Sequence, residues 1–97
     1  MLFNDFVTCH DTAMKTLKQY KSAYANQDTY VVCYVRVYSA NQDVCGFTIG
    51  EGASNVVINE SYITVSSFYK EELNKLYIID MDKIAAVEYL FVHKNRN

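Results

Sequence analysis

The sequence predicts an α+β fold, in which an N-terminal helix precedes a small, strongly bent antiparallel barrel of five to six strands. Three observations indicate this. Apolar residues recur at three- and four-residue steps over the first quarter of the chain, the period changes to two from Thr29, and short strand-like segments then follow with only brief turns between them. The 97 residues have the length of a single domain, 1–97.

One helix is predicted over about 4–25. Its apolar and aromatic positions, which share one face, are Phe3, Phe6, Val7, His10, Met14, Leu17 and Tyr24. Two starts stay open, because Asn4 and Asp11 are both suitable N-caps. The first gives one continuous helix, and the second gives a loose start with a helix from about residue 11. The segment "ANQD" at 25–28 closes the helix.

The strands of the predicted barrel occupy 29–92. The first strand, from Thr29, has two distinct faces, and a second strand covers Val44–Ile49. Residues 55–67 fit either one bent strand or a hairpin about Asn59-Glu60. A polar connection at 69–74, with room for one helical turn, leads to two last strands that break near Asp82-Lys83. The polar tail 93–97 is expected to fray.

The composition of the chain argues against several classes of function. A net charge of −2 argues against a domain that binds nucleic acid mainly through phosphates, although it leaves room for a local basic patch. The three cysteines, Cys9, Cys33 and Cys45, form no C-x-x-C pair, which favours reduced thiols and a cytoplasmic protein. No apolar run approaches the length of a membrane span.

The same residues supply little for catalysis or for cofactors. The spacing of Cys9-His10, Cys33 and Cys45 matches no standard zinc site, so no metal and no cofactor are expected. Cys9 and His10 are adjacent and point in different directions on a helix, and no triad-like set is evident. We therefore expect a protein that is not an enzyme.

All three glycines, Gly46, Gly50 and Gly52, lie within seven residues. A phosphate-binding loop is excluded, because no Lys-Ser/Thr pair and no helix follow them. The stretch "VRVYSANQDVCGFTIGEGASNVVI" at 35–58 instead resembles the first motif of the Sm-like family: a strand of alternating valines, a turn, a strand with G-x-x-x-G, a short loop, and Asn followed by three aliphatic residues.

The resemblance implies a five-stranded, bent barrel that forms rings and binds RNA. It would place Glu51 and Asn55 at the base-binding loop. The second motif departs from the family, because Asp80-Met81-Asp82-Lys83 stands where an Arg-Gly or basic-His pair is common. Carboxylates at this point repel phosphate.

A row of tyrosines on the first strand is the other candidate site. Tyr30, Tyr34 and Tyr38, with Arg36 among them, share the face opposite the alternating valines. Three interpretations stay open: a stacking platform for bases, a protein interface, or a face that the helix buries.

Together these features predict a non-enzymatic, cytoplasmic homo-oligomer that holds a nucleotide or short RNA at subunit junctions. Its candidate ligand-binding residues are Tyr34, Arg36, Tyr38, Glu51 and Asn55. The alternative is a small acidic inhibitor or adaptor of the phage type, which binds and blocks another protein such as a host defence component.

Overall fold

A computed structural model of the chain describes residues 1–25, 27–41, 43–49 and 54–96, and it begins with one helix, α1 (Phe3–Ala23). The helix is continuous from its start near the N-terminus, so the alternative start at Asp11 is wrong. Its N-cap is Leu2, which makes no side-chain capping bond. Threonine hydroxyls along α1 donate to carbonyls one turn back, as from Thr8 Oγ1 to the Asn4 carbonyl at 2.9 Å, which satisfies these polar groups locally.

Sheet A has the strand order β2-β1-β6, with β1 (Thr29–Ser39) at its centre. The strand β2 (Val44–Ile49) has the predicted bounds, and β6 (Ile84–Asn95) pairs along the whole of β1. The last strand therefore continues past the predicted end at residue 92 and includes the first three residues of the predicted tail. Asn95 lies opposite Thr29, and the Arg96 amide donates to the Asp28 carbonyl at 2.7 Å.

Sheet B has the order β3-β4-β5, formed by β3 (Ser54–Ile58), β4 (Tyr62–Tyr69) and β5 (Glu72–Asp80). Of the two alternatives for 55–67, the hairpin is the one observed. The Asn59 side chain holds its turn by accepting from the Ser61 and Tyr62 amides, each at 2.9 Å.

The next hairpin corrects a prediction. The polar connection at 69–74 contains no helical turn but a two-residue turn at Lys70 and Glu71, with φ of 50° and 66°. A short 3₁₀ turn, η1 (Met81–Lys83), then joins β5 to β6. The Asp80 carboxylate caps this turn by accepting from the Asp82 amide at 3.0 Å.

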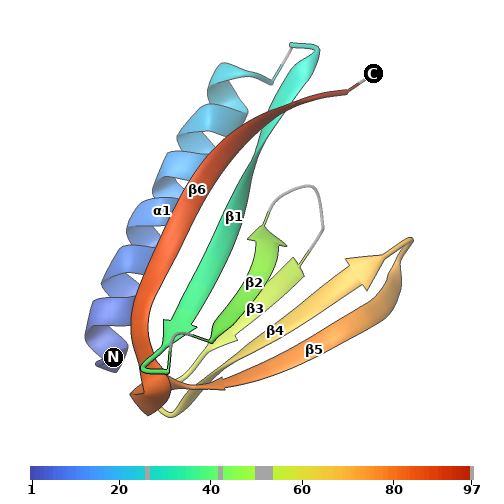
Figure 1. Cartoon of the computed structure of the whole chain (residues 1–97). Coiled ribbons are helices and arrows are strands. Elements are labelled where there is room, and N and C mark those ends of the chain that lie inside the picture. Colours follow the sequence, from blue (N-terminus) through green and yellow to red (C-terminus); the bar gives the residue numbers. More distant parts are fainter. Residues whose placement is uncertain (26, 42, 50–53, 97) are drawn as a thin grey trace.

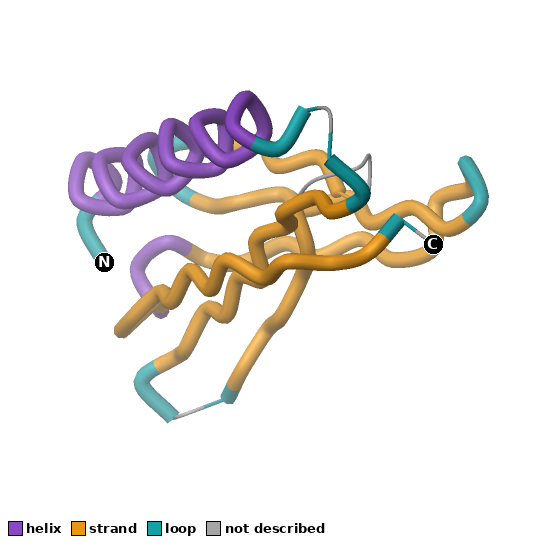
Figure 2. The backbone as a smooth tube through the Cα atoms, turned by 90° about the horizontal axis from the view of Figure 1, so that it is seen from above, coloured by secondary structure: helices purple, strands orange, loops and turns teal. Residues whose placement is uncertain are grey.

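The core lies where α1, sheet A and sheet B meet (Figures 1 and 2). Phe6 of the helix, Val35 of β1 and Ile63 of β4 belong to one buried cluster and are each at most 1% exposed. Within the described residues the six antiparallel strands form two three-stranded sheets, and no closed barrel is found. The chain thus has the predicted α+β class with an N-terminal helix, while barrel closure is not confirmed.

Candidate functional site

The two faces of β1 have different surroundings. The odd-numbered residues from Val31 to Val37 are buried in the core cluster. The helix packs on this same side, because Tyr20 of α1 contacts Phe91 of β6 with ring centroids 5.7 Å apart, and Phe91 lies opposite Cys33. The even-numbered residues of β1 therefore point away from α1, and the interpretation in which the helix buries the tyrosines is wrong.

We call the outward side of sheet A the tyrosine face; it comprises Tyr30, Val32, Tyr34, Arg36 and Tyr38 of β1 with their cross-strand neighbours on β2 and β6. The three tyrosines are half-buried and Arg36 is exposed. Val32 is 3% exposed although it lies outside the core cluster. Val92 of β6 lies opposite Val32, and with the half-buried tyrosines the centre of this face is partly covered and mainly apolar and aromatic.

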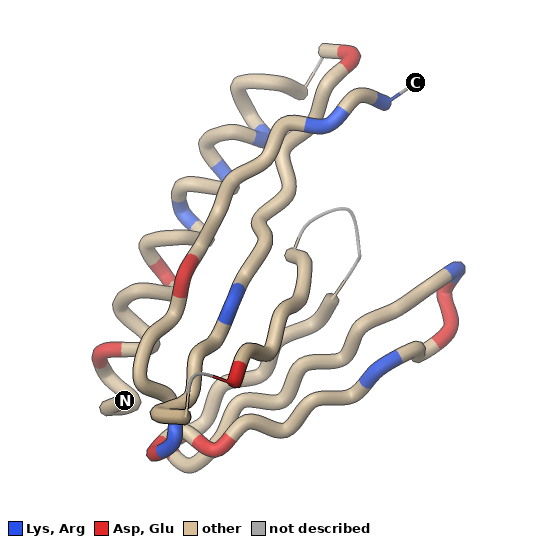
Figure 3. Tube along the Cα trace, viewed as in Figure 1, with Lys and Arg blue, Asp and Glu red and all other residues tan. Residues whose placement is uncertain are grey.

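Two cations lie over the tyrosine rings. Lys94 Nζ is 5.2 Å from the centre of the Tyr34 ring, and the Arg96 guanidinium is 5.0 Å from that of Tyr30. A hydrogen bond with Tyr34 raises the pKa of the Lys94 ammonium above its usual value. Because Lys94 is on the outer side of β6, the paired C-terminal segment adds positive charge to the tyrosine face (Figure 3).

A shallow open hollow of about 350 Å³ lies beside Arg36. Its outward-facing lining includes Tyr34, Thr48 and Leu90. Gly46 lies directly opposite Arg36 on β2, and a Cβ built there would meet only the Val35 carbonyl oxygen, at 3.8 Å. The missing side chain at Gly46 leaves room beside the guanidinium, and the backbone has no conformational need for glycine.

The five predicted ligand-binding residues do not converge. Tyr34, Arg36 and Tyr38 share the tyrosine face. Asn55 lies on β3 of sheet B, on the exposed side next to Val57. Glu51 lies outside the described residues. The inner sides of both sheets meet at the core, so Asn55 and Arg36 are on outward sides of different sheets.

Sequence patterns missed part of this face. The polar composition of the tail gives no sign that Lys94 belongs to a strand, whereas it lies on β6 opposite Tyr30. Thr48 and Leu90 lie on either side of Tyr34 in register. The period of two in "IAAVEYLFV" was the available signal, because it places Leu90 and Lys94 on one side if the strand continues.

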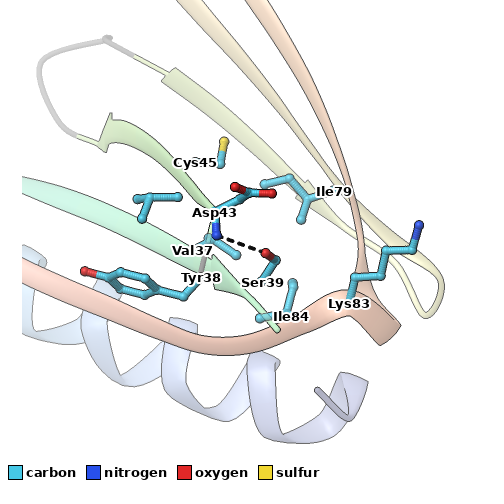
Figure 4. Close-up of a pocket in the computed structure, with 9 residues that line it drawn as sticks. Val37, Tyr38, Ser39, Asp43, Cys45, Ile79, Lys83 and Ile84 are labelled. Carbon is cyan, nitrogen blue, oxygen red and sulfur yellow. Dashed lines mark hydrogen bonds between the residues drawn. The ribbon is translucent and has the colours of Figure 1, made fainter. Parts of the chain in front are cut away.

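A smaller cavity of about 160 Å³ lies near the β1–β2 turn (Figure 4). Its apolar wall includes Val37, Ile79 and Ile84, and Lys83 and Asp43 are among its polar lining residues. The Asp43 amide donates to the Ser39 hydroxyl at 3.2 Å, which fixes the turn. The cavity is a small, mainly apolar recess between the two sheets.

One polar contact joins helix and sheet inside the molecule. His10 Nδ1 lies 3.0 Å from the Tyr89 hydroxyl. Burial lowers the pKa of His10, and burial also raises the pKa of Tyr89. Burial raises the pKa of the Cys33 thiol to about 11, so this sulfur is protonated at neutral pH and is a poor nucleophile. The lowered pKa of His10 and the raised pKa of Tyr89 both favour uncharged side chains, so the His10–Tyr89 pair is a neutral structural contact.

In residues 1–25, 27–41, 43–49 and 54–96, no three His, Cys, Asp or Glu side chains gather as metal ligands would. Over the same ranges, no helix combines the length and apolar character that a transmembrane span requires.

Comparison of the chain with protein-family models, with curated proteins and with solved structures found no match in any of the three.

Proposed function

We propose that the protein is a non-enzymatic binding protein that holds a nucleotide or a short single-stranded RNA on the tyrosine face. The observation that carries the proposal is the row of Tyr30, Tyr34 and Tyr38, interleaved with Arg36, on a sheet face that α1 leaves uncovered. Unpaired bases stack on aromatic rings, and arginine and lysine attract the phosphates between them.

The spacing of the rings favours a strand of nucleic acid over a single small molecule. Residues four apart on one strand are separated by roughly 13 Å, so Tyr30, Tyr34 and Tyr38 form an extended row along β1. Lys94 and Arg96 lie over two of the rings and supply positive charge along the same line. The hollow beside Arg36 leaves room for a base or a phosphate.

The placement of the carboxylates removes one objection to an anionic ligand. Asp80 and Asp82 line a hollow with Tyr62 and Ile78 on the outward side of sheet B. They are thus on a different sheet from the tyrosine face. Glu88 lies opposite Arg36, where it moderates the charge of the guanidinium without cancelling the three cations of this face.

An Sm-like architecture remains part of the proposal. Two features support it: the helix precedes the first strand, and β1 pairs with the last strand, β6. Pairing of the first and last strands is what closure of a small barrel requires. The ligand site proposed here uses one chain and does not include Asn55, which lies on sheet B.

The test is fluorescence anisotropy with a fluorescein-labelled oligouridine of about ten nucleotides. We expect binding to weaken as salt is added. A plot of the logarithm of the binding constant against the logarithm of the salt concentration should have a slope of about −2 if three cations contact phosphates. Tyr34→Ala should weaken binding by about 5- to 150-fold, the loss of one stacked base. Arg36→Ala should reduce the salt slope by about 0.7.

Tyr69→Ala is the matched control. Tyr69 is exposed and also carries a cation over its ring, Lys70 Nζ at 5.4 Å, but it lies at the far hairpin of sheet B. Its replacement should leave binding unchanged. Absence of binding at low salt, or equal losses for Tyr34→Ala and Tyr69→Ala, would refute the proposal.

A further inference from the structure

The outward side of sheet B carries an exposed apolar strip. Leu76 and Ile78 of β5 are 56% and 68% exposed, and Val57 of β3, which lies beyond Thr64 in the same cross-strand row as Ile78, is 63% exposed. Contiguous exposed aliphatic side chains of this kind mark interaction surfaces. The strip ends at β5, the outer strand of sheet B.

The edge of β5 is open to strand addition. The strand has nine residues, and its sequence "ELNKLYIID" contains neither proline nor glycine. Natural edge strands are usually protected by charges, prolines or bulges. The first half of β5 has such protection, because Glu72 is charged and the pairing with β4 shifts register at Asn74. From Lys75 to Asp80 the pairing is regular, and this half of the edge is the part open to strand addition. At the other long edge, β6, Tyr20 and Tyr24 of α1 pack against the inner side of the strand, and Glu88 and Lys94 place charges on its outward side, which is a usual protection of an edge strand.

We propose that β5 pairs with β5 of a second copy of this chain, in antiparallel register centred on Tyr77. The two sheets B then form one six-stranded sheet about a two-fold axis. In this register Leu76 lies opposite Ile78 of the second copy and Ile78 opposite its Leu76, so the two apolar strips join on one side of the sheet.

Charge and chemistry select this register. In a pair of identical antiparallel strands, a two-fold axis perpendicular to the sheet passes between two directly opposed residues. One residue of β5 must therefore lie opposite the same residue of the second copy, and this residue defines the centre of the register. Centring on Lys75 places two ammonium groups opposite each other, and centring on Leu76 places Glu72 opposite Asp80; like charges in these positions are destabilising. Centring on Ile78 places Leu76 opposite Asp80.

The Tyr77 register avoids all three mismatches. Besides the Leu76–Ile78 pairs, it brings Asn74 opposite Asp80 of the second copy, where the amide can donate to the carboxylate. Lys75 lies opposite Ile79, and its long side chain can reach beyond the pair to solvent. Of the registers centred on Lys75, Leu76, Tyr77 and Ile78, the Tyr77 register is thus the self-complementary one, which argues for a second copy as the occupant.

This inference goes beyond the proposed function, because it concerns sheet B and requires no nucleic acid. The first experiment is native mass spectrometry and light scattering over a concentration series. We expect a monomer–dimer equilibrium that Ile78→Lys shifts to monomer. Val44→Lys is the control, since Val44 is similarly exposed, at 54%, but lies on sheet A. A monomer at every concentration, or a ring of more than two copies, overturns the proposal.

The second experiment tests the register by disulfide formation in a Cys9→Ser background, because Cys9 is exposed. Directly opposed residues of an antiparallel pair have Cα atoms about 4.5–5.5 Å apart, within disulfide range. A mixture of Leu76→Cys and Ile78→Cys proteins should form crosslinked dimers on oxidation, and either protein alone should not. Efficient crosslinking of Leu76→Cys alone would overturn the register. RNA binding by Ile78→Lys should be unchanged, so failure of one proposal is distinguishable from failure of the other.

Discussion

Two adjacent residues of β1 should respond to truncation in opposite ways. Val35 is 1% exposed and lies between Phe47 and Tyr89 in sheet A, whereas its neighbour Arg36 is exposed on the tyrosine face. Val35→Ala removes two buried methyl groups, a transfer loss of about 1.6 kcal/mol. With the cavity that remains, the total cost should be about 2–3 kcal/mol.

The expected change in melting temperature follows from the chain length. For 97 residues, the unfolding entropy is about 0.2 kcal/mol/K, so Val35→Ala should lower Tm by about 10–15 °C. Arg36→Ala should change stability by less than about 0.5 kcal/mol, or under about 3 °C. Circular dichroism melting curves, with urea titrations at 25 °C, measure both effects.

Binding should show the reverse pattern. Measured on folded protein at low temperature, Val35→Ala should bind oligouridine like the parent chain, whereas Arg36→Ala should bind more weakly. If Val35→Ala left stability unchanged and Arg36→Ala lowered it, the assignment of the two faces of β1 would be refuted. This is the result expected if the strand were shifted by one residue, because such a shift exchanges the buried and exposed sides.

Two further predictions concern the turn and the helix contact. Lys70 and Glu71 have positive φ, so replacing them by Asn-Gly should stabilise the protein by about 1 kcal/mol; unchanged urea midpoints would contradict this. Burial lowers the pKa of His10, so its contribution to stability is complete above an unfolded-state pKa of about 6.5 and is lost as the pH falls toward the lower folded-state value. Urea titrations at neutral and acidic pH should show less pH dependence for His10→Gln than for the parent, and equal dependence would contradict the reasoning.

The sequence allowed the faces of β1 to be predicted, because side chains alternate strictly along a strand. It did not decide which face the helix covers. Both sides carry large residues, and the choice depends on packing between distant segments. In the structure, α1 covers the side of Val31 and Cys33, which have no side-chain oxygen. Covering Tyr34 would have required a buried partner for its hydroxyl.

Other features depended on contacts that local patterns do not encode. The polar C-terminal tail has no local sign of pairing, yet Asn95 lies opposite Thr29, a residue far earlier in the sequence. The Lys70–Glu71 turn lacks the glycine or asparagine that usually indicates positive φ. Of the predicted site residues, Tyr34, Arg36 and Tyr38 share a face because one strand carries them, whereas Asn55 belongs to a different sheet.

The alternation along β1 has a consequence for how this protein can change. Its odd positions are constrained by the core, while positions such as 34, 36 and 38 face outward on a backbone held by β2 and β6. Substitution of the exposed Arg36 can therefore alter what the surface recognises at little cost in folding, and substitution of the half-buried Tyr34 and Tyr38 can do so without disturbing the core. A library randomised at these three positions would sample new ligand preferences on a constant scaffold, and selection could act on recognition and on stability separately.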